Sequence, residues 1–187
     1  MRRLIPLVLG LSLTASATSW LPPQPMLIGS DYGNYAFKLL PQNVDQPTAS
    51  ARTAYGELVQ MSPNGTLKTV WKRQLANLPA KVMLNSGGQV VTIDNHAGYG
   101  QPKNALVIYG LKGQVLANYS FDQLVPKPAD CRACYLLGEP FLMAGFRIKW
   151  AYYDVPHLAL RDENGKGPTT NLVTGKLKTN WNGQERR

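Results

Sequence analysis

Turn signals that contain glycine recur along this chain and separate short apolar runs. Asn64-Gly65, Gly87-Gly88 and Lys112-Gly113 follow one another at spacings of 23 and 25 residues, and Asn164-Gly165 ends 52 residues after Gly113. Such pairs suit the two-residue type I′ hairpin, in which both central residues need a positive φ. The spacing therefore predicts a chain of antiparallel hairpins.

The runs between these turns have the composition of strands, because they are rich in Val, Ile, Leu, Thr and Tyr. A period of two places Leu67 and Trp71 on one face, which we expect to be buried, and the neighbouring lysines on the other. Residues 105–109 are apolar throughout and predict a central strand covered on both faces. Ser120 is expected to cap a short helix.

A hairpin about every 25 residues gives a four-stranded unit about every 50, which is near the size of a β-propeller blade. We therefore predict an all-β fold of antiparallel hairpin repeats that resembles part of a propeller; a β-sandwich of eight or more strands would give a similar spacing. The predicted organisation is a signal peptide over 1–17, a strand and an exposed loop over 18–54, a β-repeat domain over 55–179 and a polar tail over 180–187. The loop is expected at 41–54, which has little apolar content.

Residues 70–124 carry a longer pattern: a Trp–Leu–Asn segment, a glycine before a Val-Val-Thr-x-Asp strand, a glycine-rich loop, a strand ending in tyrosine, a Lys-Gly turn and a Tyr-Ser end. The residues are Trp71, Leu75, Asn77, Gly88, Val91, Asp94, Gly98, Gly100, Tyr109, Lys112, Gly113, Tyr119 and Ser120. This pattern resembles uncharacterised secreted bacterial proteins with β-propeller-like repeats. Residues 171–177 are similar to the strand and turn of many propeller blades.

The resemblance implies a fold and export, and it implies no reaction. A closed propeller usually has at least four blades, whereas this chain has room for about three. Three arrangements stay open: a partial propeller, a domain that pairs with another chain, and a packed pair of sheets.

The N-terminus has the order of a secretory signal. Arg2 and Arg3 precede an apolar run from Leu4 to Leu13, and Ala15-Ser16-Ala17 fits a cleavage site after Ala17. The run is too short to span a bilayer, which takes roughly 20 residues. We expect a secreted or periplasmic protein with no membrane span after cleavage.

The formal net charge is +9, and it falls to +7 without Arg2 and Arg3. A basic surface attracts anionic groups, but the lysines and arginines are scattered. Export also argues against nucleic acid as a partner. We expect a protein or an anionic envelope component as the partner, and no cofactor.

Both cysteines lie close together, at Cys131 and Cys134. Thiols outside the cytosol tend to be oxidised, so we expect a local disulfide that stabilises by about 2 kcal/mol. A redox pair would need a helix N-terminus beneath it, and Pro126 and Pro128 stand there instead. A zinc site would need further ligands.

The segment 94–104 is the best candidate for a ligand loop, because it lies between two strong strands and contains Asp94, Asn95, His96 and Tyr99. Loops on a rigid scaffold often carry function. The alternative is that Asp94 and Asn95 cap a turn through hydrogen bonds to the backbone.

A second group, Asp154 and His157, follows in the sequence. With Asp94 and His96 it would make a divalent-metal set of histidine and carboxylate ligands. No recognised catalytic motif is present, so no catalytic residue is assigned.

The sequence favours an exported, non-catalytic binding or interaction protein that acts through its loops. One alternative is a secreted enzyme, either a hydrolase or a thiol-disulfide oxidoreductase, that uses residues 94–104 or the cysteine pair. The other alternative is a structural subunit that completes a propeller with another chain.

Overall fold

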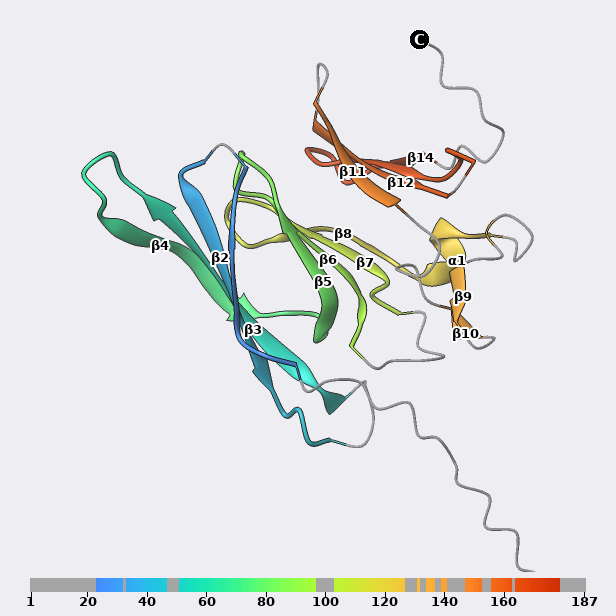
Figure 1. The fold of residues 1–187 in the computed structure, drawn as a ribbon, viewed down its shortest axis with the longest axis horizontal. Coiled ribbons are helices and arrows are strands. Elements are labelled where there is room, and N and C mark those ends of the chain that lie inside the picture. The colour runs from blue at the N-terminus through green and yellow to red at the C-terminus, as the bar shows by residue number, and fades with distance from the viewer. Residues whose placement is uncertain are drawn as a thin grey trace, which may run out of the picture.

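Antiparallel β-sheet makes up nearly all regular structure in the described part of the chain. The computed structural model describes residues 23–31, 33–46, 51–96, 103–126, 131, 134–136, 139–140, 147–152, 156–162 and 164–178. Their strands form three four-stranded sheets and one two-stranded sheet (Figure 1). In each four-stranded sheet, consecutive strands are neighbours. The predicted all-β fold of antiparallel hairpin repeats is confirmed.

The three four-stranded sheets follow one another along the chain. Sheet 1 consists of β1 (Met26–Gly29), β2 (Tyr35–Gln42), β3 (Thr53–Met61) and β4 (Leu67–Gln74). Sheet 2 consists of β5 (Pro79–Leu84), β6 (Val90–Asn95), β7 (Leu106–Tyr109) and β8 (Val115–Tyr119). Sheet 3 consists of β11 (Arg147–Tyr152), β12 (Pro156–Arg161), β13 (Thr169–Asn171) and β14 (Leu177–Lys178). Between sheets 2 and 3 the chain forms helix α1 (Phe121–Leu124) and a hairpin of β9 (Tyr135–Leu136) and β10 (Glu139–Pro140).

The repeats begin earlier than residue 55, because β1 and β2 belong to sheet 1 and the predicted boundary falls inside β3. The loop is also shorter than 41–54. Pro41 and Gln42 pair with Ala54 and Thr53, and Ala54 is fully buried. Strand β2 continues one residue past Pro41. Proline lacks a backbone N–H, and a strand tolerates this near its end.

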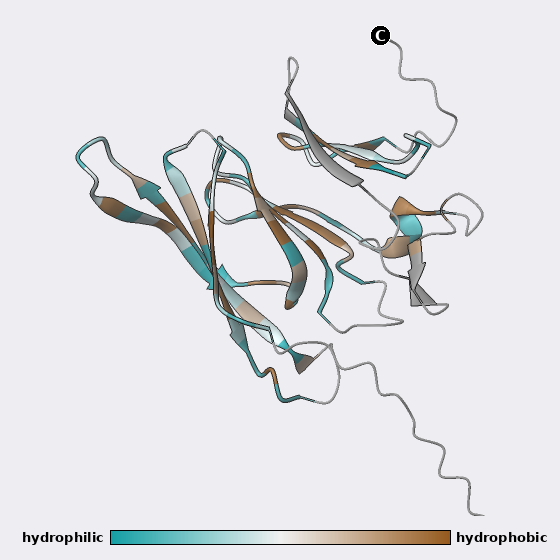
Figure 2. Cartoon of the chain, viewed as in Figure 1, coloured by the Kyte–Doolittle hydropathy of each residue, from teal (hydrophilic) through white to brown (hydrophobic). Residues whose placement is uncertain are grey.

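Sheet 2 is the middle layer and is covered on both faces. In β7, Val107 and Tyr109 contact the core shared with sheet 1, whereas Leu106 and Ile108 contact the core shared with sheet 3. Every residue of β7 is accordingly apolar and buried (Figure 2). The predicted central strand is confirmed, and the three four-stranded sheets form three layers.

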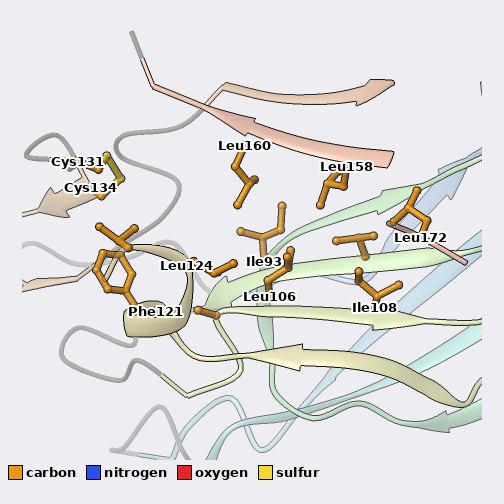
Figure 3. Packing of buried hydrophobic residues seen from close by; sticks show 13 residues of the cluster. Ile93, Leu106, Ile108, Phe121, Leu124, Cys131, Cys134, Leu158, Leu160 and Leu172 are labelled. Carbon is orange, nitrogen blue, oxygen red and sulfur yellow. A yellow bond between two sulfur atoms is a disulfide. The ribbon is translucent and has the colours of Figure 1, made fainter. Parts of the chain in front are cut away.

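Leucines fill the contact between sheets 2 and 3. Ile93, Leu106 and Ile108 of sheet 2 face Leu158 and Leu160 of sheet 3 (Figure 3). Helix α1 closes one end of this cluster through Phe121 and Leu124. Its N-cap is Ser120, as predicted, and the Ser120 hydroxyl accepts from the backbone N–H of Gln123 while the Gln123 side chain accepts from the backbone N–H of Ser120. None of the described helices is long and apolar enough to cross a bilayer.

The glycine turns join strands as predicted, but their type differs. At Gly65 (φ 82°), Gly88 (φ 76°) and Gly113 (φ 76°) the glycine has a positive φ, and the residue before it does not. The N–H of Gly65 donates to the carbonyl of Ser62, and the N–H of Ser62 donates to that of Thr66. This is a three-residue loop, a type I turn followed by a left-handed glycine, and it needs only one positive φ. Asn64 and Lys112 thereby avoid the left-handed strain of a type I′ turn.

The regular spacing breaks at the third sheet. Gly65 and Gly113 each join the third and fourth strands of a sheet, whereas Gly165 joins the second and third strands of sheet 3. Gly175 holds the equivalent position there. The segment that contains α1 and the β9–β10 hairpin lengthens the chain between sheets 2 and 3 and so disrupts the regular spacing of the turns. The 52-residue interval from Gly113 to Gly165 is therefore a coincidence.

A bulge in β4 overturns one predicted face. The pairing of β3 with β4 shifts between Leu58 and Val59, and the extra residue is Val70. Trp71 therefore points into the core, while Leu67 points away from it and is 63% exposed. A bulge places two residues opposite one and reverses the alternation beyond it.

Candidate functional site

The predicted ligand loop begins at the end of β6. Asp94 and Asn95 are the last two residues of that strand, and both side chains are buried. Asp94 has a positive φ of 54°, and its N–H donates to the carbonyl of Ala105. This left-handed residue interrupts the extended backbone one residue before β6 ends, so Asp94 and His96 are not related by a simple extended step. Tyr99 lies outside the described residues.

Asn77 fixes the end of β6 from the segment that leads into β5. Its amide nitrogen Nδ2 lies 2.9 Å from the carbonyl oxygen of Asp94 and 2.6 Å from Oδ1 of Asn95. The Asn77 side chain is only 5% exposed. A buried amide must find such partners, because desolvation without them costs about 1–3 kcal/mol.

Further asparagines extend this network to sheet 2's later strands. Nδ2 of Asn95 donates to the carbonyl of Lys103 at 3.0 Å, and Nδ2 of Asn104 donates to the carbonyl of Ala76 at 3.2 Å. Nδ2 of Asn118 donates to Oδ1 of Asn104 at 2.7 Å. These bonds clamp the two ends of the loop between β6 and β7.

The network is suited to holding a loop rather than to moving protons. Side-chain amides are neutral and do not titrate in water, and their donors are used on carbonyl oxygens. The sequence pattern pointed to Asn95 as a candidate residue, whereas the roles of Asn104 and Asn118 were not predicted from it. The signal was the repeated Asn at strand ends, where an amide can bond to the backbone of neighbouring segments.

The predicted metal set is described only in part, because Asp154 lies outside the described residues. His157 is in β12 of sheet 3, opposite Asn171, whereas Asp94 is near the end of β6 in sheet 2 and His96 follows that strand. Where the structure describes the chain, no group of three or more His, Cys, Asp or Glu side chains could hold a metal ion. The metal set therefore stays a prediction.

The predicted disulfide is confirmed, since Cys131 and Cys134 are bonded, with α-carbons 5.4 Å apart. The N–H of Cys134 donates to the carbonyl of Cys131 at 3.1 Å, which makes the segment a tight turn. Both cysteines are buried and join the cluster that contains Phe121 and Leu124 (Figure 3). Thiol exchange requires access to a sulfur atom, so burial makes this disulfide a staple.

Replacing both Cys131 and Cys134 with serine is expected to lower the free energy of unfolding by about 2 kcal/mol, because the short loop loses its cross-link. Urea unfolding followed by tryptophan fluorescence measures this change. Thiol titration of the folded wild-type protein is the control and should find no free thiol. Two free thiols would contradict the disulfide.

Aromatic side chains form the seam between sheets 1 and 2. The ring of Trp71 lies 5.6 Å from that of Phe37 and 6.1 Å from that of Tyr109, between centroids. Burial raises the pKa of Tyr109, and the hydroxyl accepts from the N–H of Ala76 at 2.9 Å. Arg73 lies over the Tyr109 ring, with Cζ 5.7 Å from the centroid. The phenol stays protonated and holds the two sheets together.

The other face of sheet 1 points away from sheet 2, and we call it the outer face. Strand pairing places these side chains on it: Leu27, Lys38, Leu40, Tyr55, Glu57, Val59, Met61, Leu67, Thr69 and Lys72. Three of its large apolar side chains are exposed: Leu27 (73%), Leu67 (63%) and Met61 (47%). Met61 and Leu67 are direct cross-strand partners beside the Gly65 turn.

Charged and apolar side chains are mixed on the outer face. Glu57 pairs across the strands with Lys38 and Lys72, and the hydroxyl of Thr69 donates to Oε1 of Glu57 at 2.8 Å. A shallow hollow of about 260 Å³ lies beside this row and is lined by Leu40, Gln42, Tyr55 and Lys72. The outer face therefore combines apolar side chains with polar groups that cross-strand pairing and a hydrogen bond hold in place.

The outer face was not predicted as a site from the sequence. The signal was present in β3, where Tyr55, Val59 and Met61 alternate with the buried Ala54 and Leu58. A strand with apolar residues on both faces is either central in the fold or open to a partner, and only the structure separates these cases.

We find no match to this chain among protein-family models, curated proteins or solved structures. The likeness to secreted proteins with propeller-like repeats therefore depends on the sequence motifs alone and stays a prediction.

Proposed function

We propose that this chain is an exported, non-catalytic binding protein that docks a protein partner on the outer face of sheet 1. The observation that carries the proposal is the exposure of Leu27, Met61 and Leu67 on one regular sheet face. Met61 and Leu67 are direct cross-strand partners, and Leu27 lies two strands away on the same face. Exposed apolar side chains gathered on one face mark interaction surfaces.

The residues that the sequence offered for chemistry support a binding role. The cysteine pair is closed and buried, and the Asn95 amide is used on a backbone carbonyl. A thiol-disulfide enzyme needs an accessible sulfur. The buried disulfide therefore favours binding over redox catalysis.

A protein partner fits the outer face better than an anionic envelope surface does. Lysines alternate with Glu57 across the strands, so the row has no single sign of charge. A polyanion selects a surface of one sign, whereas a protein interface accepts both signs around apolar contacts.

Export is supported by the arginine pair, apolar run and Ala-x-Ala order at 1–17 and by the disulfide, because such bonds persist mainly outside the cytosol. The mature chain is expected to begin at Thr18 when it is recovered from outside the cytosol and sequenced from its N-terminus.

Site-specific photo-crosslinking in producing cells tests the binding face. A photoreactive residue at Leu67 or Leu27 should form adducts with a polypeptide, because both side chains are exposed on the outer face. The same group at Leu111, which is exposed in the β7–β8 turn, is the matched control and should form few adducts. Equal yields at all three positions, or none at Leu67 and Leu27, would refute the proposal.

A further inference from the structure

The turn between the third and fourth strands has the same role in sheets 2 and 3, because it docks on the last strand of the sheet before it. In sheet 2, a Cβ on Gly113 would lie 3.0 Å from the Trp71 ring in β4. In sheet 3, a Cβ on Gly175 would lie 2.6 Å from the carbonyl oxygen of Leu116 and 3.0 Å from Cβ of Ala117 in β8. Both glycines have a positive φ, which favours glycine, and at Gly175 the nearest atom belongs to the backbone and cannot rotate away.

A hydrogen bond accompanies each of these contacts. Arg73 donates through Nη1 to the carbonyl of Gly113, and the Tyr119 hydroxyl donates to the carbonyl of Gly175. Each donor lies two residues after a side chain that touches the glycine: Arg73 follows Trp71, and Tyr119 follows Ala117. The two seams therefore share one docking element, a glycine turn on a fourth strand.

Sheet 1 contains a turn of the same kind, and this turn is not docked on another strand of the described chain. Gly65 lies in the turn between β3 and β4 and has a φ of 82°, as the docked glycines do. No atom lies within 4 Å of the place where its Cβ would stand. The β3–β4 hairpin extends away from the other sheets (Figure 1), and exposed Met61 and Leu67 flank its turn.

A fourth strand on which no glycine turn docks, among the described residues, lies at the other end of the stack. β14 is the fourth strand of sheet 3 and ends the strand order of that sheet in the described residues. β4 and β8 hold the same position in sheets 1 and 2, and each receives a glycine turn from the next sheet. The chain therefore carries both halves of the same contact.

We propose that the partner on the outer face is a second copy of this chain, bound head to tail, so that the Gly65 turn of one copy docks on β14 of the other. The inference rests on the proposed function, because it names the occupant of the same face. The contact between the Gly65 turn and β14 would repeat the contacts that already join sheet 2 to sheet 1 and sheet 3 to sheet 2. Two copies related by a twofold axis would form this contact twice and assemble six sheets, within the four to eight blades of closed propellers. A heterologous, head-to-tail contact gives a closed ring only when the rotation that relates successive copies adds up to a full turn.

Sedimentation velocity of the full exported chain tests the assembly. Wild type is expected to sediment as a dimer. Leu67→Glu should weaken the dimer by about tenfold or more, since a buried charge replaces an apolar contact. Leu111→Glu, an exposed apolar position outside the outer face, should leave the dimer unchanged. Circular dichroism checks that both variants fold. If Leu67→Glu does not fold, Met61→Glu takes its place in the test.

Crosslinking between heavy- and light-isotope copies tests the head-to-tail geometry. A lysine-reactive reagent should join Lys68, beside the Gly65 turn, to Lys178 of β14 across the two copies. A dimer with only Lys68-to-Lys68 crosslinks, or a dimer equally stable in Leu67→Glu and wild type, would overturn the inference. A monomeric chain whose Leu67 photo-adduct contains a different protein would overturn the inference and leave the binding function standing. A monomeric chain with no adduct would overturn both.

Discussion

Gly175→Ala is expected to lower the free energy of unfolding by about 3 kcal/mol or more, which is a large share of the stability of a typical domain. Two costs add at this position. The φ of 70° puts an alanine in the left-handed region, at a cost of about 1–2 kcal/mol. The new Cβ would also lie 2.6 Å from the backbone oxygen of Leu116. A backbone atom cannot rotate away, so sheets 2 and 3 must separate, and overpacking of this kind costs about 1–3 kcal/mol.

Two other glycines give matched controls for this prediction. Gly65 and Gly165 have φ values of 82° and 75°, and no atom lies within 4 Å of a Cβ at either position. At a protein concentration where the chain sediments as a monomer, alanine there should cost about 1–2 kcal/mol from backbone strain alone. Urea unfolding of the three variants measures the difference. Equal losses at all three positions would show that Gly175 is not docked on β8.

Phe37→Ala is expected to cost about 3–5 kcal/mol, which is the usual range for a fully buried phenylalanine. The side chain has no exposed surface, its ring lies 5.6 Å from that of Trp71, and it fills the space above Gly56. Its removal leaves a cavity in the seam between sheets 1 and 2. The change should appear as a lower urea midpoint with an unchanged slope.

Leu27→Ala is the control for Phe37→Ala, because Leu27 is in the same sheet but 73% exposed on the opposite face. It should change the free energy of unfolding by less than about 0.5 kcal/mol, at a protein concentration where the chain sediments as a monomer. A loss at Leu27 as large as that at Phe37 would mean that the two faces of sheet 1 have been assigned the wrong way round.

Local signals made the strands and turns predictable from the sequence. A glycine after Asn or Lys supplies the positive φ that a hairpin loop needs, so the positions of the turns at Gly65 and Gly113 were predicted correctly, although their type was not. The continuous apolar run at 105–109 predicted a strand covered on both faces. Ser120 before a helical turn and two cysteines three residues apart are also local features, and the structure contains both the N-cap and the disulfide.

Contacts between segments far apart in the sequence decided the rest. The bulge at Val70 reversed the face of Leu67, because register depends on the partner strand. Asn77 is buried because the end of β6 offers it two oxygen acceptors. The glycine turns look alike in sequence, yet Gly175 is packed on β8 while Gly65 is open. The sequence by itself determined where the backbone can turn, since φ is a property of one residue and its neighbours. Only the tertiary structure determined which turn meets a neighbouring strand, because the space around a Cβ is set by residues brought there by folding.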